Sequence, residues 1–170
     1  VHGERRVETL TTVKVAEVNV FNNTTYHTEV GYDSNANKVL FLSAGNQNSI
    51  TGRVGTISGT DITLGSASDL GGTAQHAIPG SLTFDTTANK FVYLYGTGSY
   101  GQPLKARTMT ISGTSVSAGS EFTVDGSNMP SNLTANAVYD PSINKTVAIY
   151  VNDSTPVFKL LTISGTSLSG

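Results

Sequence analysis

The chain of 170 residues contains no cysteine, which excludes a disulfide, a thiolate zinc site and a cysteine nucleophile. Charged residues are scarce as well, at 13 % of the sequence, against roughly 25 % in ordinary globular domains. The formal net charge is only −2, so no broad basic surface for nucleic acid is expected. No apolar run approaches the roughly 20 residues that a membrane span needs.

Helical patterning is also missing, because no stretch repeats its apolar residues every 3.6 positions, and we expect almost no helix. Ser, Thr, Asn and Gly supply the polarity, which favours β-structure with many tight turns and is common in proteins that work outside the cell. No secretion signal is visible. The chain begins at Val1 rather than Met, which leaves open a processed product or a piece of a longer protein.

What the sequence does contain is a repeat. The pentapeptide Thr-Ile-Ser-Gly-Thr begins at Thr56, Thr110 and Thr162, so successive copies are 54 and 52 residues apart (110 − 56 and 162 − 110). A fixed period of this size indicates a repeat architecture. Ser-Gly is hairpin-turn chemistry, in which glycine supplies the positive φ. The structural turn glycines predicted from this motif are Gly59, Gly113 and Gly165.

A second motif, aromatic-Asp-x-x-x-Asn-Lys, recurs with the same period at a different phase and precedes an apolar strand each time. Its carboxylate can accept hydrogen bonds from backbone N–H groups two and three residues further on, and its Asn tolerates a left-handed backbone. We therefore interpret the motif as a hairpin turn and its aspartates as structural rather than as a catalytic or calcium-binding set, since a calcium loop needs several carboxylates together. The three aspartates are Asp33, Asp85 and Asp140.

Four strands per repeat are predicted. Strands are expected over Val13–Val20, Tyr26–Tyr32 and Val39–Leu42, and one full repeat is assembled from Arg53–Ile57, Ile62–Ala67, His76–Phe84 and Lys90–Tyr95. The predicted fold class is all-β, with antiparallel four-stranded repeats like the blades of a β-propeller. The whole chain, 1–170, is expected to be one repeat domain with repeats at approximately 1–55, 56–109 and 110–170.

Three blades fall short of the roughly four to eight that close a propeller. The alternatives are completion by another copy, completion within a longer chain, or an array of β-modules along a fibre. Each repeat also carries one cation four residues before the motif Ile, on the same face of its strand. We expect these cations to bind a backbone carbonyl or a repeated Asp, and they are Arg53, Arg107 and Lys159.

The sequence contains no residue pattern that is typical of a catalytic site. The three histidines have no zinc-binding spacing, the remaining carboxylates are scattered singly, and no phosphate-binding glycine loop or nucleophile motif occurs. We therefore expect no enzyme, no metal site and no cofactor. Aromatic rings stack on sugar faces and amides bind sugar hydroxyls, so the candidate ligand-binding positions are aromatic or imidazole side chains in or beside polar loops: Tyr26, His27, His76 and Tyr100.

The strings Thr-Ile-Ser-Gly-Thr-Ser-Val-Ser at 110–117, Thr-Ile-Ser-Gly-Thr-Ser-Leu-Ser at 162–169 and Tyr-Asp-Ser-Asn-Ala-Asn-Lys-Val at 32–39 resemble a known repeat family. That family occurs in tail-fibre and other virion-associated proteins of marine bacteriophages and in some large bacterial surface proteins. The resemblance covers the chain from about residue 13. It implies propeller-like β-structure and a role as a virion appendage or host-adhesion module, and it carries no catalytic residues.

The expected function is thus a non-enzymatic phage virion fibre or adhesion module that displays loops for host cell-surface recognition. The alternative is a purely structural protein of an extracellular appendage or surface filament. The expected partners are a host cell-surface glycan or protein, other virion proteins, and further copies of the chain or a larger assembly. Nucleic acid and a membrane span are not expected, and the expected location is the virion or the extracellular space.

Overall fold

The computed structural model describes residues 17–22, 25–45, 49–72, 81–96, 103–127, 134–152 and 154–170. These residues form three antiparallel sheets and no helix, which confirms the all-β class with four-stranded antiparallel repeats. The first sheet contains β1 (Thr25–Asp33), β2 (Lys38–Gly45), β3 (Thr51–Ser58), β4 (Asp61–Leu64) and β5 (Ser68–Asp69). The second contains β6 (Ser81–Asp85), β7 (Lys90–Gly96), β8 (Leu104–Ser112), β9 (Ser115–Ala118) and β10 (Phe122–Asp125). The third contains β11 (Ala135–Asp140), β12 (Lys145–Asn152), β13 (Thr155–Ser164) and β14 (Ser167–Ser169).

Each sheet has the same topology. Three strands form an antiparallel meander, β1-β2-β3, β6-β7-β8 and β11-β12-β13, and a short fourth strand, β4, β9 or β14, folds back on the third. In the first two sheets a further short strand, β5 or β10, also pairs with the third strand. The two sequence motifs form two hairpins of every sheet, because the Asp motif joins the first and second strands and the Ser-Gly motif joins the third and fourth.

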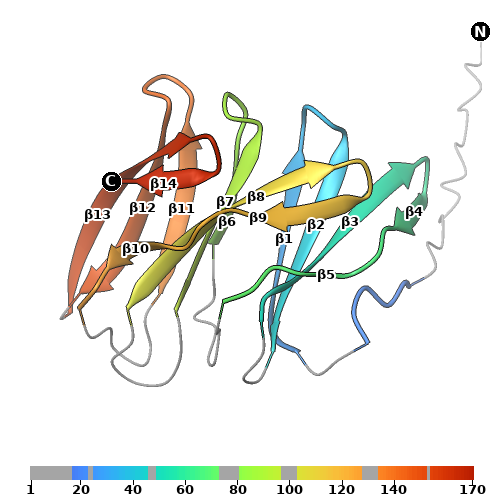
Figure 1. The fold of residues 1–170 in the computed structure, drawn as a ribbon, viewed down its shortest axis with the longest axis horizontal. Helices are drawn as coiled ribbons and strands as arrows, with labels where there is room; N and C mark the ends of the chain where they lie inside the picture. Colours follow the sequence, from blue (N-terminus) through green and yellow to red (C-terminus); the bar gives the residue numbers. More distant parts are fainter. Residues whose placement is uncertain are drawn as a thin grey trace, which may run out of the picture.

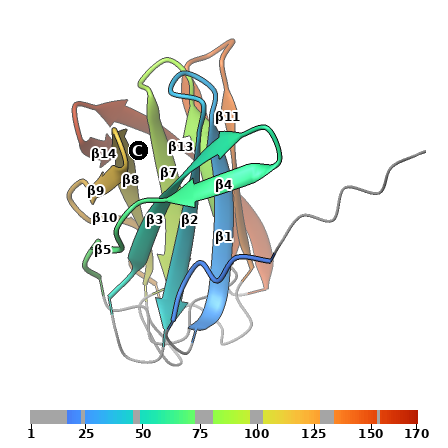
Figure 2. The same ribbon diagram turned by 90° about the vertical axis from the view of Figure 1, so that its right-hand side faces the viewer.

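The three sheets lie face to face in a row, with the second sheet in the middle (Figures 1 and 2). One apolar core lies between the first and second sheets and includes Leu42, Val54 and Tyr93. Another lies between the second and third sheets and includes Leu94, Ala148 and Leu161. Successive side chains of a strand point to opposite faces, so β7 contributes Tyr93 to one core and Leu94 to the other. The middle sheet is therefore buried on both faces, which accounts for its unbroken apolar strand β7.

The prediction that Arg53–Ile57 and Lys90–Tyr95 belong to one four-stranded repeat is wrong, because the two strands lie in different sheets. The strand at Arg53–Ile57, which is part of β3, pairs with β2 and belongs to the first sheet, whereas Lys90–Tyr95 lies in β7 of the second. Gly96 pairs with Leu104, so the Gly-rich loop between them joins neighbours of one sheet. The chain crosses to the next sheet after β5, and the sheets begin at Thr25, Ser81 and Ala135.

The strand expected over Val13–Val20 is wrong in the part that the structure describes, because residues 17–20 are not in a strand. Instead of pairing with the sheet edge, this segment is fixed through the carbonyl of Val20, which accepts a 2.8 Å hydrogen bond from Nη1 of Arg53. The strands expected at Tyr26–Tyr32 and Val39–Leu42 are confirmed as parts of β1 and β2. Within the described residues, no helix has the length and apolar character of a membrane span.

Candidate functional site

The repeated aspartates act within their own turns. Oδ1 of Asp33 accepts hydrogen bonds of 2.9 Å from the backbone N–H groups of Asn35 and Ala36. Asp85 does the same for Thr87 and Ala88, at 2.9 and 2.7 Å. At the third copy, bonds from Ser142 are the main cause that lowers the pKa of Asp140 below its usual value. The carboxylates are thus held by backbone donors and are not gathered into one site.

Left-handed residues complete both kinds of turn. The last Asn of each Asp motif has φ close to +54° (Asn37, Asn89 and Asn144 at 54°, 54° and 53°), and the motif glycines Gly59, Gly113 and Gly165 have φ of 61°, 60° and 58°. Asn and Gly adopt this region more readily than other residues. Both repeated motifs therefore encode backbone geometry.

The repeated cations bind backbone carbonyls, which confirms one of the two kinds of partner expected for them. Arg53, Arg107 and Lys159 each donate a 2.8 Å hydrogen bond, to the carbonyls of Val20, Leu70 and Val124 respectively. Leu70 directly follows the short strand β5, and Val124 lies in the short strand β10, one residue before its end, so both stand close to where the chain leaves the preceding sheet. Each cation thus ties its own sheet to the segment that comes before it.

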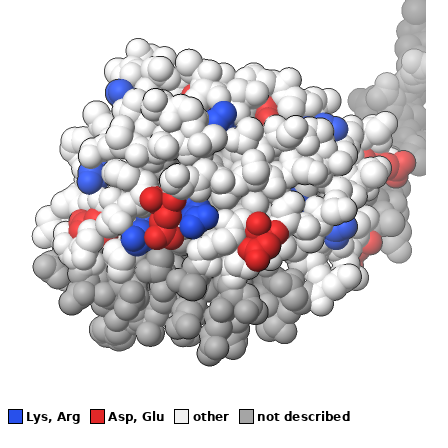
Figure 3. All heavy atoms as spheres, viewed as in Figure 1, with Lys and Arg blue, Asp and Glu red and all other residues white. Residues whose placement is uncertain are grey.

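A charged cluster on the second sheet consists of Tyr95 of β7, Lys105 and Arg107 of β8, and Glu121, which directly precedes β10. Glu121 accepts a 2.7 Å hydrogen bond from the Tyr95 hydroxyl and lies 3.2 Å from Nζ of Lys105 and 3.8 Å from Nη2 of Arg107. Nε of Arg107 donates to the Tyr95 hydroxyl at 2.9 Å. The face of the molecule seen in Figure 3 is mostly uncharged, and acidic atoms lie between basic ones in its lower half. Every charged group of the cluster has a partner within it, which is typical of a structural network.

This cluster predicts an acid-dependent loss of stability. Burial by itself raises the pKa of Glu121, but hydrogen bonds from Tyr95 and Lys105 and the charges of Lys105 and Arg107 outweigh it, so the pKa lies below its usual value of 4.5. A depressed carboxyl pKa stabilises the fold above the unfolded-state value, and that stabilisation is lost as the pH falls through the folded-state value. Glu121→Gln should therefore weaken the fold at pH 7 and flatten the loss of unfolding free energy below about pH 4.5.

Urea denaturation at a series of pH values measures this effect. The matched control is Asp61→Asn, which removes an exposed carboxylate and should keep the wild-type pH profile. An identical acid profile in Glu121→Gln and wild type would contradict the assignment.

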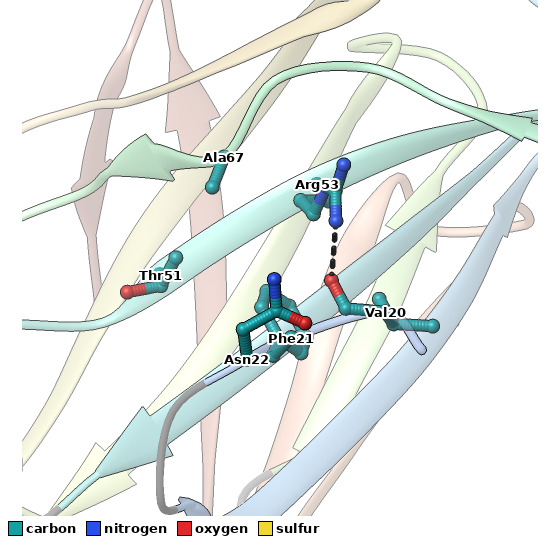
Figure 4. Close-up of a pocket in the computed structure, with 6 residues that line it drawn as sticks. All are labelled: Val20, Phe21, Asn22, Thr51, Arg53 and Ala67. Atoms are coloured by element: carbon teal, nitrogen blue, oxygen red, sulfur yellow. Dashed lines mark hydrogen bonds between the residues drawn. The ribbon is translucent and has the colours of Figure 1, made fainter. Parts of the chain in front are cut away.

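A pocket of about 300 Å³ opens on the first sheet, on the side away from the second (Figure 4). Its walls come from three places in the chain: the segment before β1, the strand β3, and the stretch after β4. Arg53 forms one side of the pocket, and its Nε donates a 2.9 Å hydrogen bond to the carbonyl of Gly65. The lining residues are Val20, Phe21, Asn22, Thr51, Arg53 and Ala67. A second hollow of about 220 Å³ shares Val20 and Phe21 and reaches Val30 and Phe41 of the sheet.

This pocket has the chemistry of an apolar docking hollow. Among the described residues that line it, Arg53 is the only charged side chain and already donates two hydrogen bonds to carbonyls, and none of them forms a nucleophile–base pair. Within the described part of the chain, no three His, Asp or Glu side chains gather closely enough to hold a metal ion.

Of the four candidate ligand positions, the structure describes the side chain of His27. His27 is a half-buried residue of β1 that takes part in side-chain or backbone interactions. Tyr26 also belongs to β1, but its side chain lies outside what the structure describes, as do His76 and Tyr100 altogether. Their role in binding stays a prediction.

Sequence reasoning missed a larger feature, the outer face of the third sheet, defined here by Val138, Val147, Ile149, Phe158 and Leu160. Pairing places Val138 opposite Val147, Val147 opposite Leu160, and Ile149 opposite Phe158, so these side chains share one face. Four of the five are exposed, and Phe158 is 71 % exposed. Aligning the repeats would not have found this face, because Leu42 and Leu94, the counterparts of Ile149, are equally apolar yet buried. The chain matches no protein-family model, no curated protein and no solved structure.

Proposed function

We propose that the chain is a non-enzymatic module of a bacteriophage virion fibre that works outside the cell. In this role the stacked sheets form a rigid scaffold, and the connections between strands recognise a glycan or protein on the host surface. Other virion proteins join it to the particle. The basis for the phage assignment is the resemblance of the two repeated motifs to virion-associated repeats.

The observation that carries the adhesion role is the contrast between the two ends of the sheets. At one end, the Asp turns at 34–37, 86–89 and 141–144 have equal length in every sheet. At the other end, β2 is joined to β3 by residues 46–50, β7 to β8 by 97–103, and β12 to β13 by 153–154. Binding residues lie disproportionately on variable loops that a rigid scaffold positions. The variable end, which includes Tyr100, is therefore the recognition surface.

A second role, as a purely structural unit of an extracellular appendage, is favoured by the apolar outer face of the third sheet. Large exposed apolar patches on soluble domains mark interaction surfaces. The two roles are compatible, since a fibre can be both assembled through sheet faces and adhesive through loops.

Glycan-array binding with residues 1–170 tests the adhesion role. We expect binding to a restricted set of glycans, because ring stacking and amide bonding select particular sugar faces. Tyr100→Ala should reduce the signal, whereas Ile143→Ala, which truncates an exposed side chain at the opposite end, should leave it unchanged. Absence of binding to every glycan would contradict glycan recognition and leave the structural role, and release of reducing sugar would contradict the non-enzymatic assignment.

A further inference from the structure

The outer face of the third sheet corresponds, position by position, to faces that are buried in the first and second sheets. Counting four residues on from the Lys of each Asp motif gives Leu42, Leu94 and Ile149. Leu42 and Leu94 are 1 % and 0 % exposed because the following sheet covers them, whereas Ile149 is 48 % exposed. The third sheet thus carries the same kind of apolar face, with no further sheet on it among the described residues.

The third strand gives the same result. The position two residues before the first Thr of the Thr-Ile-Ser-Gly-Thr motif is occupied by Val54, Thr108 and Leu160. Val54 and Thr108 are fully buried, whereas Leu160 is exposed. Four residues before the motif the first two sheets have Gly52 and Ala106, buried against the next sheet, but the third has Phe158. The third sheet therefore presents a bulkier surface than its two counterparts, with one aromatic side chain that projects from it.

The outer face of the first sheet corresponds to the face of the second sheet that packs on the first, and to the face of the third sheet that packs on the second. Tyr139 of the third sheet is 9 % exposed, and its hydroxyl bonds both to Asn144 of its own turn and to Thr87 of the second sheet. Its counterpart Tyr32 makes the same bond to Asn37, at 2.9 Å, and is 53 % exposed. Tyr32 thus has the local half of the contact, and no preceding sheet lies against it in the part of the chain that the structure describes.

The segment before β1 already occupies the place of a predecessor's last residues. The Val20 carbonyl binds Arg53 as the Leu70 carbonyl binds Arg107, and Leu70 belongs to the core between the first and second sheets. Beside Val20 lies the 300 Å³ pocket. At the interface of the first and second sheets, a Cβ added to Gly52 would meet Leu70. Because Phe158 is the counterpart of Gly52 and Val20 that of Leu70, the equivalent contact would place the Phe158 ring against Val20, at this pocket.

We propose that the outer face of the third sheet docks onto the outer face of the first sheet of a second copy of this chain, with Phe158 of one copy in the pocket beside Val20 of the other. The interface repeats the packing that joins the sheets within one chain. It is heterologous, so repeated use of it closes a ring or extends a filament. A ring of two copies would hold six sheets, within the roughly four to eight of known propellers. The proposal does not depend on whether the loops bind a glycan.

Sedimentation velocity of residues 1–170 over a dilution series tests the proposal. We expect a concentration-dependent species of at least twice the 17.7 kDa chain mass. Phe158→Glu and Val30→Glu each place a charge on one of the two faces, and each alone should yield monomer. Thr155→Glu adds the same charge to β13, on the side that faces away from the interface, and should assemble like the wild type. Circular dichroism and urea denaturation establish that all three variants are folded.

Mixing the two monomeric variants separates head-to-tail docking from its alternatives. Each variant retains one intact face, so a mixture of Phe158→Glu and Val30→Glu should form a heterodimer through one interface. A wild-type chain that stays monomeric at every concentration would overturn the proposal. So would assembly that Phe158→Glu abolishes but Val30→Glu does not, because that pattern indicates third sheets packed on each other.

Discussion

Replacing Gly119 with alanine is expected to destabilise the protein by about 1–3 kcal/mol, the usual cost of adding a methyl group where there is no room. Gly119 follows β9 in the second sheet, where the chain meets the Ser-Gly turn of the third. A Cβ at this position would overlap the carbonyl oxygen of Thr166 and Oγ1 of Thr108. Oγ1 of Thr108 already donates a 2.7 Å hydrogen bond to that same carbonyl, so neither atom can move without loss.

Urea denaturation of Gly119→Ala and wild type measures this cost. The matched control is Gly126→Ala, because among the described residues a Cβ there would meet only Thr123 Cγ2, at 3.9 Å, which is ordinary contact. Gly65→Ala should behave like Gly119→Ala, since its Cβ would overlap the Thr114 carbonyl at the interface of the first and second sheets. Equal unfolding free energies for Gly119→Ala and the control would show that the sheets are not held at this close approach.

The same close approach recurs at both interfaces between sheets. At both interfaces a glycine that follows the fourth strand of one sheet lies against the Ser-Gly turn of the next. On the other side, Asn35 and Asn89 join the Asp turns of the first and second sheets, and polar bonds join the first strands of the second and third sheets. At the second interface, for example, Oγ of Ser81 accepts a 2.7 Å hydrogen bond from the N–H of Ala137. Contacts at both edges of the sheets fix their relative position more tightly than apolar packing alone, which is not directional.

The turns could be predicted from the sequence because their chemistry is local. Asp85 needs only the two N–H groups that follow it, and Gly113 needs only its own positive φ. The grouping of strands into sheets could not be predicted in the same way. Residues 97–103 join neighbours of one sheet and residues 126–134 cross between sheets, yet both are short polar segments that contain Gly, Ser and Pro.

The outer face of the third sheet could not be predicted from the sequence either, because the exposure of a side chain depends on which sheet lies beside its strand. Leu94 and Ile149 are both β-strand aliphatics in apolar runs, and local pattern gives them the same prediction of burial. Only the count of sheets and the order of stacking show that one is covered and the other is not. The pocket beside Val20 has the same origin, since it brings residues before β1 together with residues that lie 29 or more positions further along the chain (51 − 22).

Leu94 and Ile149 supply the second large prediction. Leu94→Ala should cost about 2–5 kcal/mol of unfolding free energy, because it removes a fully buried side chain from the core between the second and third sheets. Ile149→Ala makes a similar truncation at the equivalent strand position, but on a half-exposed side chain. In the dilute monomer its cost should stay within about 1 kcal/mol, since little apolar area is returned to water.

The decisive measurement is the dependence of both costs on protein concentration. If the third sheet docks on a second copy, association stabilises the wild type by mass action, and Ile149→Ala weakens that association as well as the fold. Its cost should then rise in concentrated solution, while that of Leu94→Ala changes little because its core lies within one chain. A cost of Ile149→Ala that stays small at every concentration would mean that this face remains bare. A cost as large as that of Leu94→Ala already in dilute monomer would mean that the side chain is covered within its own chain.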